Sequence, residues 1–325
     1  MHDADPERPE HQLSEHRSSV RRSLAVETEM LRKVKGFENF QLPFTEDQMK
    51  RLAVEGPIIV INVSEIRCDA LIVSIDEIKI VELPYLKEDN LQQKMDPLET
   101  LGNEDRRSAM LKEESSAGTG GAAILDALEW SWRVAVRPIL DETPLTPSKR
   151  VWWITTGKAG RAPFHAAGCH SPGSTEKTLS RVTSSYISSF KALQYARDKK
   201  SSLATPRRDI LLVTMGHNPP PHRNLNVSAE EKALYDVFRE NPITQKSCFT
   251  HLRQWNRDSV LDRLRCHSFA HFACHGSSFN FDPSQGGLLL AKTESKVAML
   301  TVEDIKRYTL EAGVIAYLLA YLTAE

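Results

Sequence analysis

The sequence predicts an α/β fold with a doubly wound, mainly parallel sheet flanked by helices. From about residue 120 onward, short apolar and β-branched runs alternate with stretches of helical length and period. The apolar runs have the length of buried strands rather than of helices. In such sheets, active sites lie at the carboxyl ends of strands, and His275 and Gly276 occupy such an end.

The individual elements follow from local patterns. Thr45 and Ser228 begin helices as N-caps, with Glu231 completing a capping box, and Thr301 caps the last helix. Helices are expected over 20–34, 45–54, 124–140, 184–197, 228–240 and 301–308. Strands are expected in "PIIVINVS", "DALIVSIDEIKIVELP", "RVWWITTG", "DILLVTMG", "CHSFAHFACHG" and "VIAYLLAYL".

Three segments are expected along the chain. Residues 1–22 are polar and charged and predict a disordered lead-in. Residues 23–117 contain helices and strands and run into a polar loop over 86–123. Residues 118–325 form the main domain. The glycines of "SSAGTGGAA" do not form a phosphate loop, because no Gly-Lys-Ser/Thr follows them, and no cofactor is expected.

The composition excludes several classes of function. The chain has 325 residues, of which 40% are hydrophobic and 26% charged, and its net charge is −1. Neither a nucleic acid nor a membrane is therefore expected as partner, which leaves proteins or peptides. The longest apolar run, residues 312–324, is too short to span a bilayer. The polar N-terminus predicts no signal peptide, so we expect a cytoplasmic protein with five reduced cysteines.

The stretch "CHSFAHFACHG" contains the residues that suggest chemistry. His267, His271 and His275 are spaced by four, but on a strand four residues span roughly 13 Å, so no metal site is expected. Cys274 and His275 are neighbours on the same strand and point to opposite faces, so they do not form a catalytic pair. Cys274 is expected to be a buried core residue, and His275 is the stronger functional candidate.

Several motifs together resemble the CHAT family, a group of caspase-like domains. "VWWITTGKAGRAPFHAAGCH" resembles the strand and Pro-x-His-Ala-Ala-Gly signature of that family, and "SFAHFACHG" resembles its Cys-His-Gly strand. "EWSWRVAVRPIL", "GLLLA" and "LTVEDIKRYTLEAGVIAYL" follow the family's order of elements. The upstream "EGPIIVINVSEIRCDALIV" is similar to the segment that precedes the domain in fungal members. No 34-residue repeat is visible.

The resemblance implies a cysteine peptidase mechanism with one residue replaced. It assigns the base to His275, with the Gly276 N–H as an oxyanion donor, and places the nucleophilic cysteine roughly 50 positions later. The matching stretch is "YLLAYLTAE", in which Tyr321 stands where the family has cysteine. We therefore expect a domain that is incomplete at its C-terminus and inactive, a pseudopeptidase or an interaction module.

Two alternatives stay open at this point. One is an active cysteine endopeptidase that uses Cys274 as nucleophile with His165 as base. In the main interpretation, His165 instead supports the structure near the edge of the sheet. The other alternative is a non-enzymatic scaffold that binds proteins through its N-terminal helices.

Overall fold

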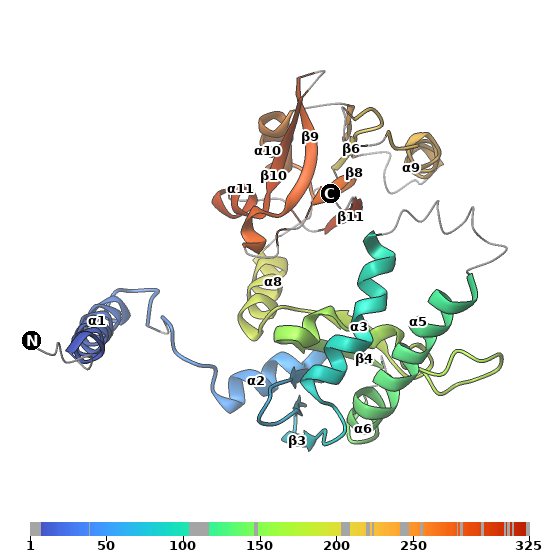
Figure 1. The fold of residues 1–325 in the computed structure, drawn as a ribbon. Helices are drawn as coiled ribbons and strands as arrows, with labels where there is room; N and C mark the ends of the chain where they lie inside the picture. Colours follow the sequence, from blue (N-terminus) through green and yellow to red (C-terminus); the bar gives the residue numbers. More distant parts are fainter. Residues whose placement is uncertain are drawn as a thin grey trace, which may run out of the picture.

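The strands of this computed structural model form two sheets rather than one (Figure 1). The structure describes residues 8–38, 40–103, 117–145, 149–202, 209–218, 222, 224–240, 247–253, 256–277, 279, 282–293, 296–308, 310, 313 and 315–322. In Figure 1 the first sheet lies in the lower part of the molecule and the second in the upper part. The predicted α/β class is confirmed, with parallel strands at the centre of each sheet and helices around them.

The first sheet has the strand order β3-β2-β1-β4-β5. Its strands are β1 (Ile58–Asn62), β2 (Asp69–Val73), β3 (Ile78–Glu82), β4 (Arg150–Thr155) and β5 (Thr183–Tyr186). β1 is parallel to β4 and β4 to β5, whereas β1–β2 and β2–β3 are antiparallel. Both faces of this sheet are covered by apolar side chains. One face contributes Ile59, Ile61 and Trp153 to a large core, and the other contributes Ile58, Val73 and Ile154 to a smaller one.

The second sheet has the order β10-β9-β8-β6-β7, and β11 also pairs with β8. Its strands are β6 (Ile210–Thr214), β7 (Phe249–Arg253), β8 (Phe269–Ser277), β9 (Gly287–Thr293), β10 (Lys296–Thr301) and β11 (Ile315–Leu322). β8 is parallel to β6 and to β11, and β6 is parallel to β7. The predicted strands at β6, β8 and β11 are therefore confirmed and lie side by side.

The helices are distributed around the two sheets (Figure 1). Near the first sheet lie α2 (Glu46–Leu52), α3 (Glu88–Asn103), α5 (Ala117–Ser131), α6 (Arg137–Asp141), α7 (Thr178–Arg181) and α8 (Phe190–Ser202). Near the second lie α9 (Ser228–Glu240), α10 (Arg257–Leu264) and α11 (Val302–Arg307). α8 packs Leu193 on the first sheet, and its Lys199 donates a hydrogen bond to the Leu310 carbonyl before β11. None of the described helices combines the length and apolar character needed to cross a membrane.

The predicted helix over 124–140 is confirmed and has a local irregularity. α5 continues through a single π-helical turn, η2 (Trp132–Val136), into α6. Pro138 lies just after this turn. A proline inside a helix has no N–H to donate and its ring collides with the carbonyl four residues earlier, so a wider turn relieves the collision.

Three predicted boundaries differ from the structure. Residues 8–22, expected to be disordered, belong to helix α1 (Arg8–Arg32). The loop expected over 86–123 contains α3 and the start of α5, with residues 104–116 outside the described residues. The helix expected over 184–197 begins later, at Phe190, because residues 183–186 form β5. The sequence does not predict these helices because their composition is polar and their apolar periodicity is weak. It does not predict β5 because this strand is short and half-exposed.

The first sheet contains strands from both sides of the boundary expected between residues 117 and 118. β1, from the earlier segment, pairs with β4 from the later one. The large core likewise combines Leu91 and Met95 with Trp130 and Trp132. β4 has β1 on one edge and β5 on the other, so both segments contribute to one sheet and one core.

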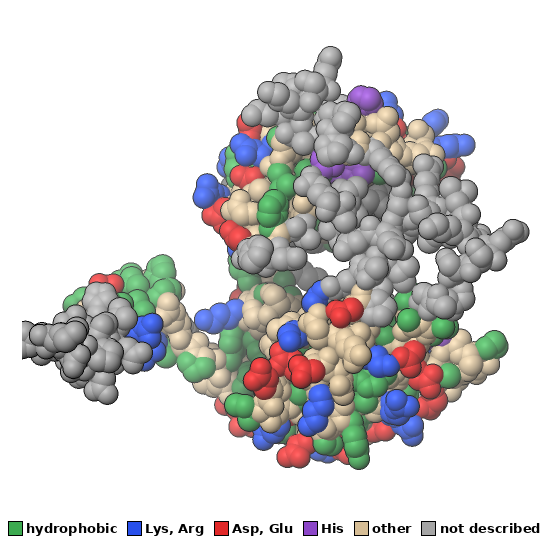
Figure 2. Space-filling view, viewed as in Figure 1, with side chains coloured by type: hydrophobic (Ala, Val, Ile, Leu, Met, Phe, Trp, Pro, Cys, Tyr) green, Lys and Arg blue, Asp and Glu red, His purple; other side chains and the backbone are tan. Residues whose placement is uncertain are grey.

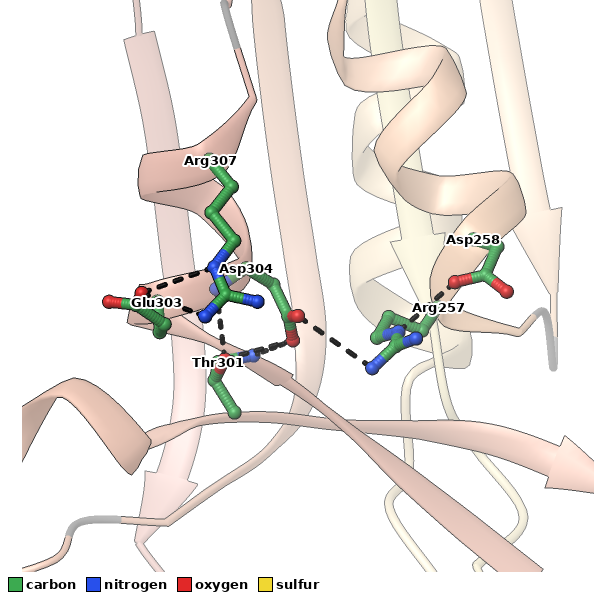
Figure 3. Close-up of polar contacts among 6 residues, drawn as sticks. All are labelled: Arg257, Asp258, Thr301, Glu303, Asp304 and Arg307. Atoms are coloured by element: carbon green, nitrogen blue, oxygen red, sulfur yellow. Dashed lines mark hydrogen bonds and ion pairs between the residues drawn. The ribbon is translucent and has the colours of Figure 1, made fainter.

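Helix α11 is anchored at its start by its N-cap and by an ion pair to α10. The Thr301 side chain accepts a hydrogen bond from the Asp304 N–H at 3.0 Å, and the Asp304 carboxylate accepts one from the Thr301 N–H. Arg257 of α10 lies 3.7 Å from the same carboxylate (Figure 3). The predicted N-cap is confirmed, and the ion pair joins α10 to α11.

Candidate functional site

Strand β8 separates an apolar face from a polar one. Ala270, Phe272 and Cys274 alternate along one face and join the core beneath α10. His271 and His275 occupy the alternate positions, on the other face. The side chains of Cys274 and His275 thus point to opposite faces of the sheet, as expected for successive residues of a strand.

Cys274 has the environment of a structural thiol. Its side chain is fully buried in the second core, and burial raises its pKa to about 12. A thiol with such a pKa is almost wholly protonated at neutral pH, and the thiolate is the reactive form.

His275 lies near the carboxyl end of β8 and is almost completely buried, with 2% of its surface exposed. Its ring lies 5.7 Å, centre to centre, from that of His222, which follows β6 in the chain. Gly276 pairs with Leu288 of β9 on one edge of the strand and with Leu322 of β11 on the other. Figure 2 shows histidine side chains at the surface of this part of the molecule.

The parallel ladder between β8 and β11 pairs position 321 with His275. The same ladder pairs Tyr317 with His271, and there the rings stack at 5.0 Å with an interplanar angle of 14°. Neighbouring strands lie about 4.8 Å apart, so paired positions are adjacent. The strand topology therefore brings together the two positions that the family pattern singles out, although they are far apart in the sequence.

A relay of hydrogen bonds covers the polar face beside β7 and α9. The Thr214 hydroxyl donates to Glu231 at 2.8 Å and lies 2.9 Å from Nε2 of His251. Nδ1 of His251 lies 2.9 Å from the Tyr235 hydroxyl, and Arg253 donates to Glu231 at 2.7 Å. The simplest assignment has Tyr235 donating to Nδ1 of His251 and Nε2–H donating to Thr214, so that each donor has one acceptor.

The charges of this relay follow from its surroundings. Burial lowers the pKa of His251, and this effect outweighs the opposing effect of Glu231, which raises it. The lowered pKa favours the neutral imidazole. Burial alone would raise the pKa of Glu231, but hydrogen bonds from Arg253 and Thr214 outweigh it, so this pKa is lowered. The relay is thus a carboxylate, a neutral histidine and a positively charged arginine.

The other histidines of the stretch have separate partners. Nε2 of His271 lies 2.6 Å from Glu230 of α9, and Nε2 of His267 lies 2.9 Å from Thr250. Nδ1 of His267 contacts the Arg263 carbonyl at 2.7 Å. Within the part of the chain that the structure describes, no group of three or more His, Cys, Asp or Glu side chains is placed to hold a metal ion.

His165 lies with the elements of the first sheet. It is in the short helical turn η4 (Phe164–Ala166), and both its backbone N and its Nδ1 are 3.0 Å from the Tyr186 hydroxyl. Tyr186 belongs to β5, at the edge of the first sheet. His165 is therefore next to Phe164 of the first core, whereas Cys274 belongs to the second core. The two residues of the alternative catalytic scheme belong to different cores.

Sequence reasoning missed the polar partners on α9 and β7. The sequence predicts Glu231 as the capping-box partner of Ser228 and Glu230 as part of an acidic first turn. The Glu231 carboxylate instead accepts hydrogen bonds from Thr214 and Arg253. "FTHLR" was not recognised as a strand, so His251 and Arg253 had no predicted neighbours. The alternation of Phe249, His251 and Arg253 with Thr250 and Leu252 was the available signal.

The family model of the CHAT domain matches residues 125–324, more than half of the chain. The chain belongs to the CHAT domain family. The match to the CHAT domain begins within α5 and extends through β11, so it includes β4 and β5 of the first sheet and the six strands described for the second. No curated protein matches the chain.

Proposed function

We propose that this CHAT domain protein is a caspase-like pseudopeptidase, a fungal-type member that binds proteins or peptides in the cytoplasm and does not cleave them. The observation that carries the proposal is the pairing of position 321 with His275 across the β8–β11 ladder. The family's pattern has a cysteine at that position, and this chain has tyrosine. Membership in the CHAT family supports a relation to caspase-like peptidases.

The chemistry of the peptidase reaction explains why a tyrosine at position 321 would abolish catalysis. In the peptidase mechanism, the histidine accepts the proton of the cysteine thiol, and the thiolate sulfur attacks the substrate's carbonyl carbon. The carbonyl oxygen becomes an oxyanion that a backbone N–H stabilises, a role that Gly276 would fill here. A tyrosine phenol has an ordinary pKa near 10 and is a weak nucleophile at neutral pH. His275 would then be a base without a nucleophile to activate.

The environment of Cys274 supports the inactive state. The raised pKa and complete burial of this thiol oppose its use as a nucleophile. His165, the base of the alternative scheme, has Tyr186 as its hydrogen-bond partner. Both observations weigh against an active centre built from Cys274 and His165.

The proposal is tested by restoring the thiol. The Tyr321→Cys variant of the full chain is treated with a peptidyl chloromethyl ketone, and labelling is followed by mass spectrometry. We expect labelling at the introduced cysteine, and we expect His275→Ala in the same background to slow it about 100-fold or more. Leu319→Cys is the matched control, because that position pairs across the ladder with Ala273 rather than with a histidine.

The unaltered protein provides the opposite test. The native chain should show no labelling at Cys274 under the same conditions. Labelling at Cys274 that disappears in His165→Ala would overturn the pseudopeptidase proposal. Equal labelling of the Tyr321→Cys and Leu319→Cys variants would remove the special role of position 321.

A further inference from the structure

Helix α1 extends away from the rest of the molecule with its apolar side chains exposed (Figure 1). With 25 residues it is about 37 Å long. Among its side chains that the structure describes, Thr28 alone is buried. Figure 2 shows hydrophobic side chains gathered on one side of this helix. A helix with such a face normally packs it against another element.

Five exposed residues of α1 follow a coiled-coil spacing, and the exposed Val26 and Met30 lie to one side of them. Arg17, Val20, Leu24, Glu27 and Leu31 are separated alternately by three and four residues, so they lie along one stripe of the helix. Val20 is 52% exposed, Leu24 55% and Leu31 42%. The stripe is apolar except at Arg17 and Glu27, which are both exposed and carry opposite charges.

The two charges are placed symmetrically about the middle of the stripe. If a second α1 lay antiparallel, with the twofold axis at Arg22, Val20 would face Leu24 and Arg17 would face Glu27 of the other copy. In a parallel pair, Arg17 would face Arg17 and Glu27 would face Glu27. Like charges across such a seam are destabilising, and polar residues within a seam set the orientation of the helices.

We propose that α1 is a self-association element, which pairs antiparallel with α1 of a second copy of this chain. The occupant is a second copy because the stripe is complementary to itself in charge, and the same pairing brings Val20 against Leu24. Each dimer would contain two Arg17–Glu27 pairs flanking a centre of Val20 and Leu24. This inference does not depend on the proposed loss of catalysis.

The test is the oligomeric state of the full chain, measured by sedimentation velocity over a range of concentrations. We expect a monomer–dimer equilibrium whose dissociation constant rises about tenfold or more in Arg17→Glu and in Glu27→Arg. The double variant R17E/E27R should return to the wild-type value, because it restores opposite charges only in the antiparallel arrangement. Arg22→Glu and Glu29→Arg are the matched controls, since they make the same charge changes off the stripe.

Several outcomes would overturn the proposal. A wild-type chain that stays monomeric throughout the concentration range would do so, and so would a dimer that is unaffected by Arg17→Glu. A double variant as weak as the single ones would exclude the antiparallel pairing. Far-UV circular dichroism of each variant should match the wild type, because none of these side chains is buried.

Discussion

The two sheets of this protein differ in what covers their faces. The first has apolar side chains on both faces, and β1 accordingly is the near-continuous apolar run Ile58–Asn62. The second has one apolar face and one that carries His251, His271 and His275. The comparison indicates that the first sheet mainly provides stability, whereas the second holds polar groups in fixed positions, which a functional site requires.

The largest expected effect comes from the core of the first sheet. Trp153→Ala should lower the free energy of unfolding by about 3–5 kcal/mol, because it leaves a large cavity. Trp153 is fully buried, and its ring stacks on Phe164 at 6.2 Å. Urea denaturation followed by circular dichroism measures the effect. Tyr195→Ala on the exposed side of α8 is the control and should change the value by less than about 0.5 kcal/mol.

A smaller loss is expected on the polar face of the second sheet. Thr214→Val keeps the shape of the side chain but removes the hydroxyl that links Glu231 to His251. Leaving the buried partners without this hydrogen bond should lower the free energy of unfolding by about 1–3 kcal/mol. The same denaturation experiment measures it, with Leu212→Ile on the same strand as a volume-conserving control. A neutral result for Thr214→Val would mean that the relay does not hold α9 in place.

The free energy of unfolding should depend on pH through His251 and Glu231, which contact each other on the polar face of the second sheet. The pKa of His251 is lowered from its ordinary value of 6.5, so the unfolded chain binds a proton more readily than the native one as the pH falls below 6.5. The lowered pKa of Glu231 acts in the same direction below its ordinary value of 4.5. The free energy of unfolding should therefore decrease on acidification, in two stages.

Denaturation at a series of pH values between 7 and 4 would measure this decrease. His251→Gln removes the group that titrates first, so its stability should change less between pH 7 and pH 5. A wild-type stability that stays constant or rises over that interval would contradict the assignment of a neutral, buried His251.

The smallest effect on stability is expected for modification of the exposed thiols. Cys248 and Cys266 are exposed, whereas Cys274 is buried with a pKa of about 12. Hydrogen bonding from Ser171 lowers the pKa of the half-exposed Cys169, which favours its reactive thiolate. Iodoacetamide at pH 8 should therefore modify Cys169, Cys248 and Cys266 and leave Cys274 unmodified until urea is added. Peptide mapping by mass spectrometry distinguishes the sites. Early modification of Cys274 would show that the apolar face of the second sheet is open.

Local sequence determined much of this protein. β-branched runs and capping residues were sufficient to predict β1, β4, β6, β8, β11, α9 and the start of α11, because these signals are short-range. Alternation along β8 was also enough to place Cys274 and His275 on opposite faces. The motifs that resemble the CHAT family are also contiguous stretches of residues, so they can be read from the sequence alone.

Tertiary structure alone decided how the elements combine. β1 joins the first sheet beside β4, and the residues of either strand do not by themselves specify that partner, because pairing also depends on which strand edges the rest of the fold leaves free. Likewise, Glu231 contacts Thr214 and His251 only because α9 packs across β6 and β7. The sequence suggested that position 321 matters, and the parallel pairing of β11 with β8 places it beside His275. Such contacts join distant residues and leave no periodic signal in either segment.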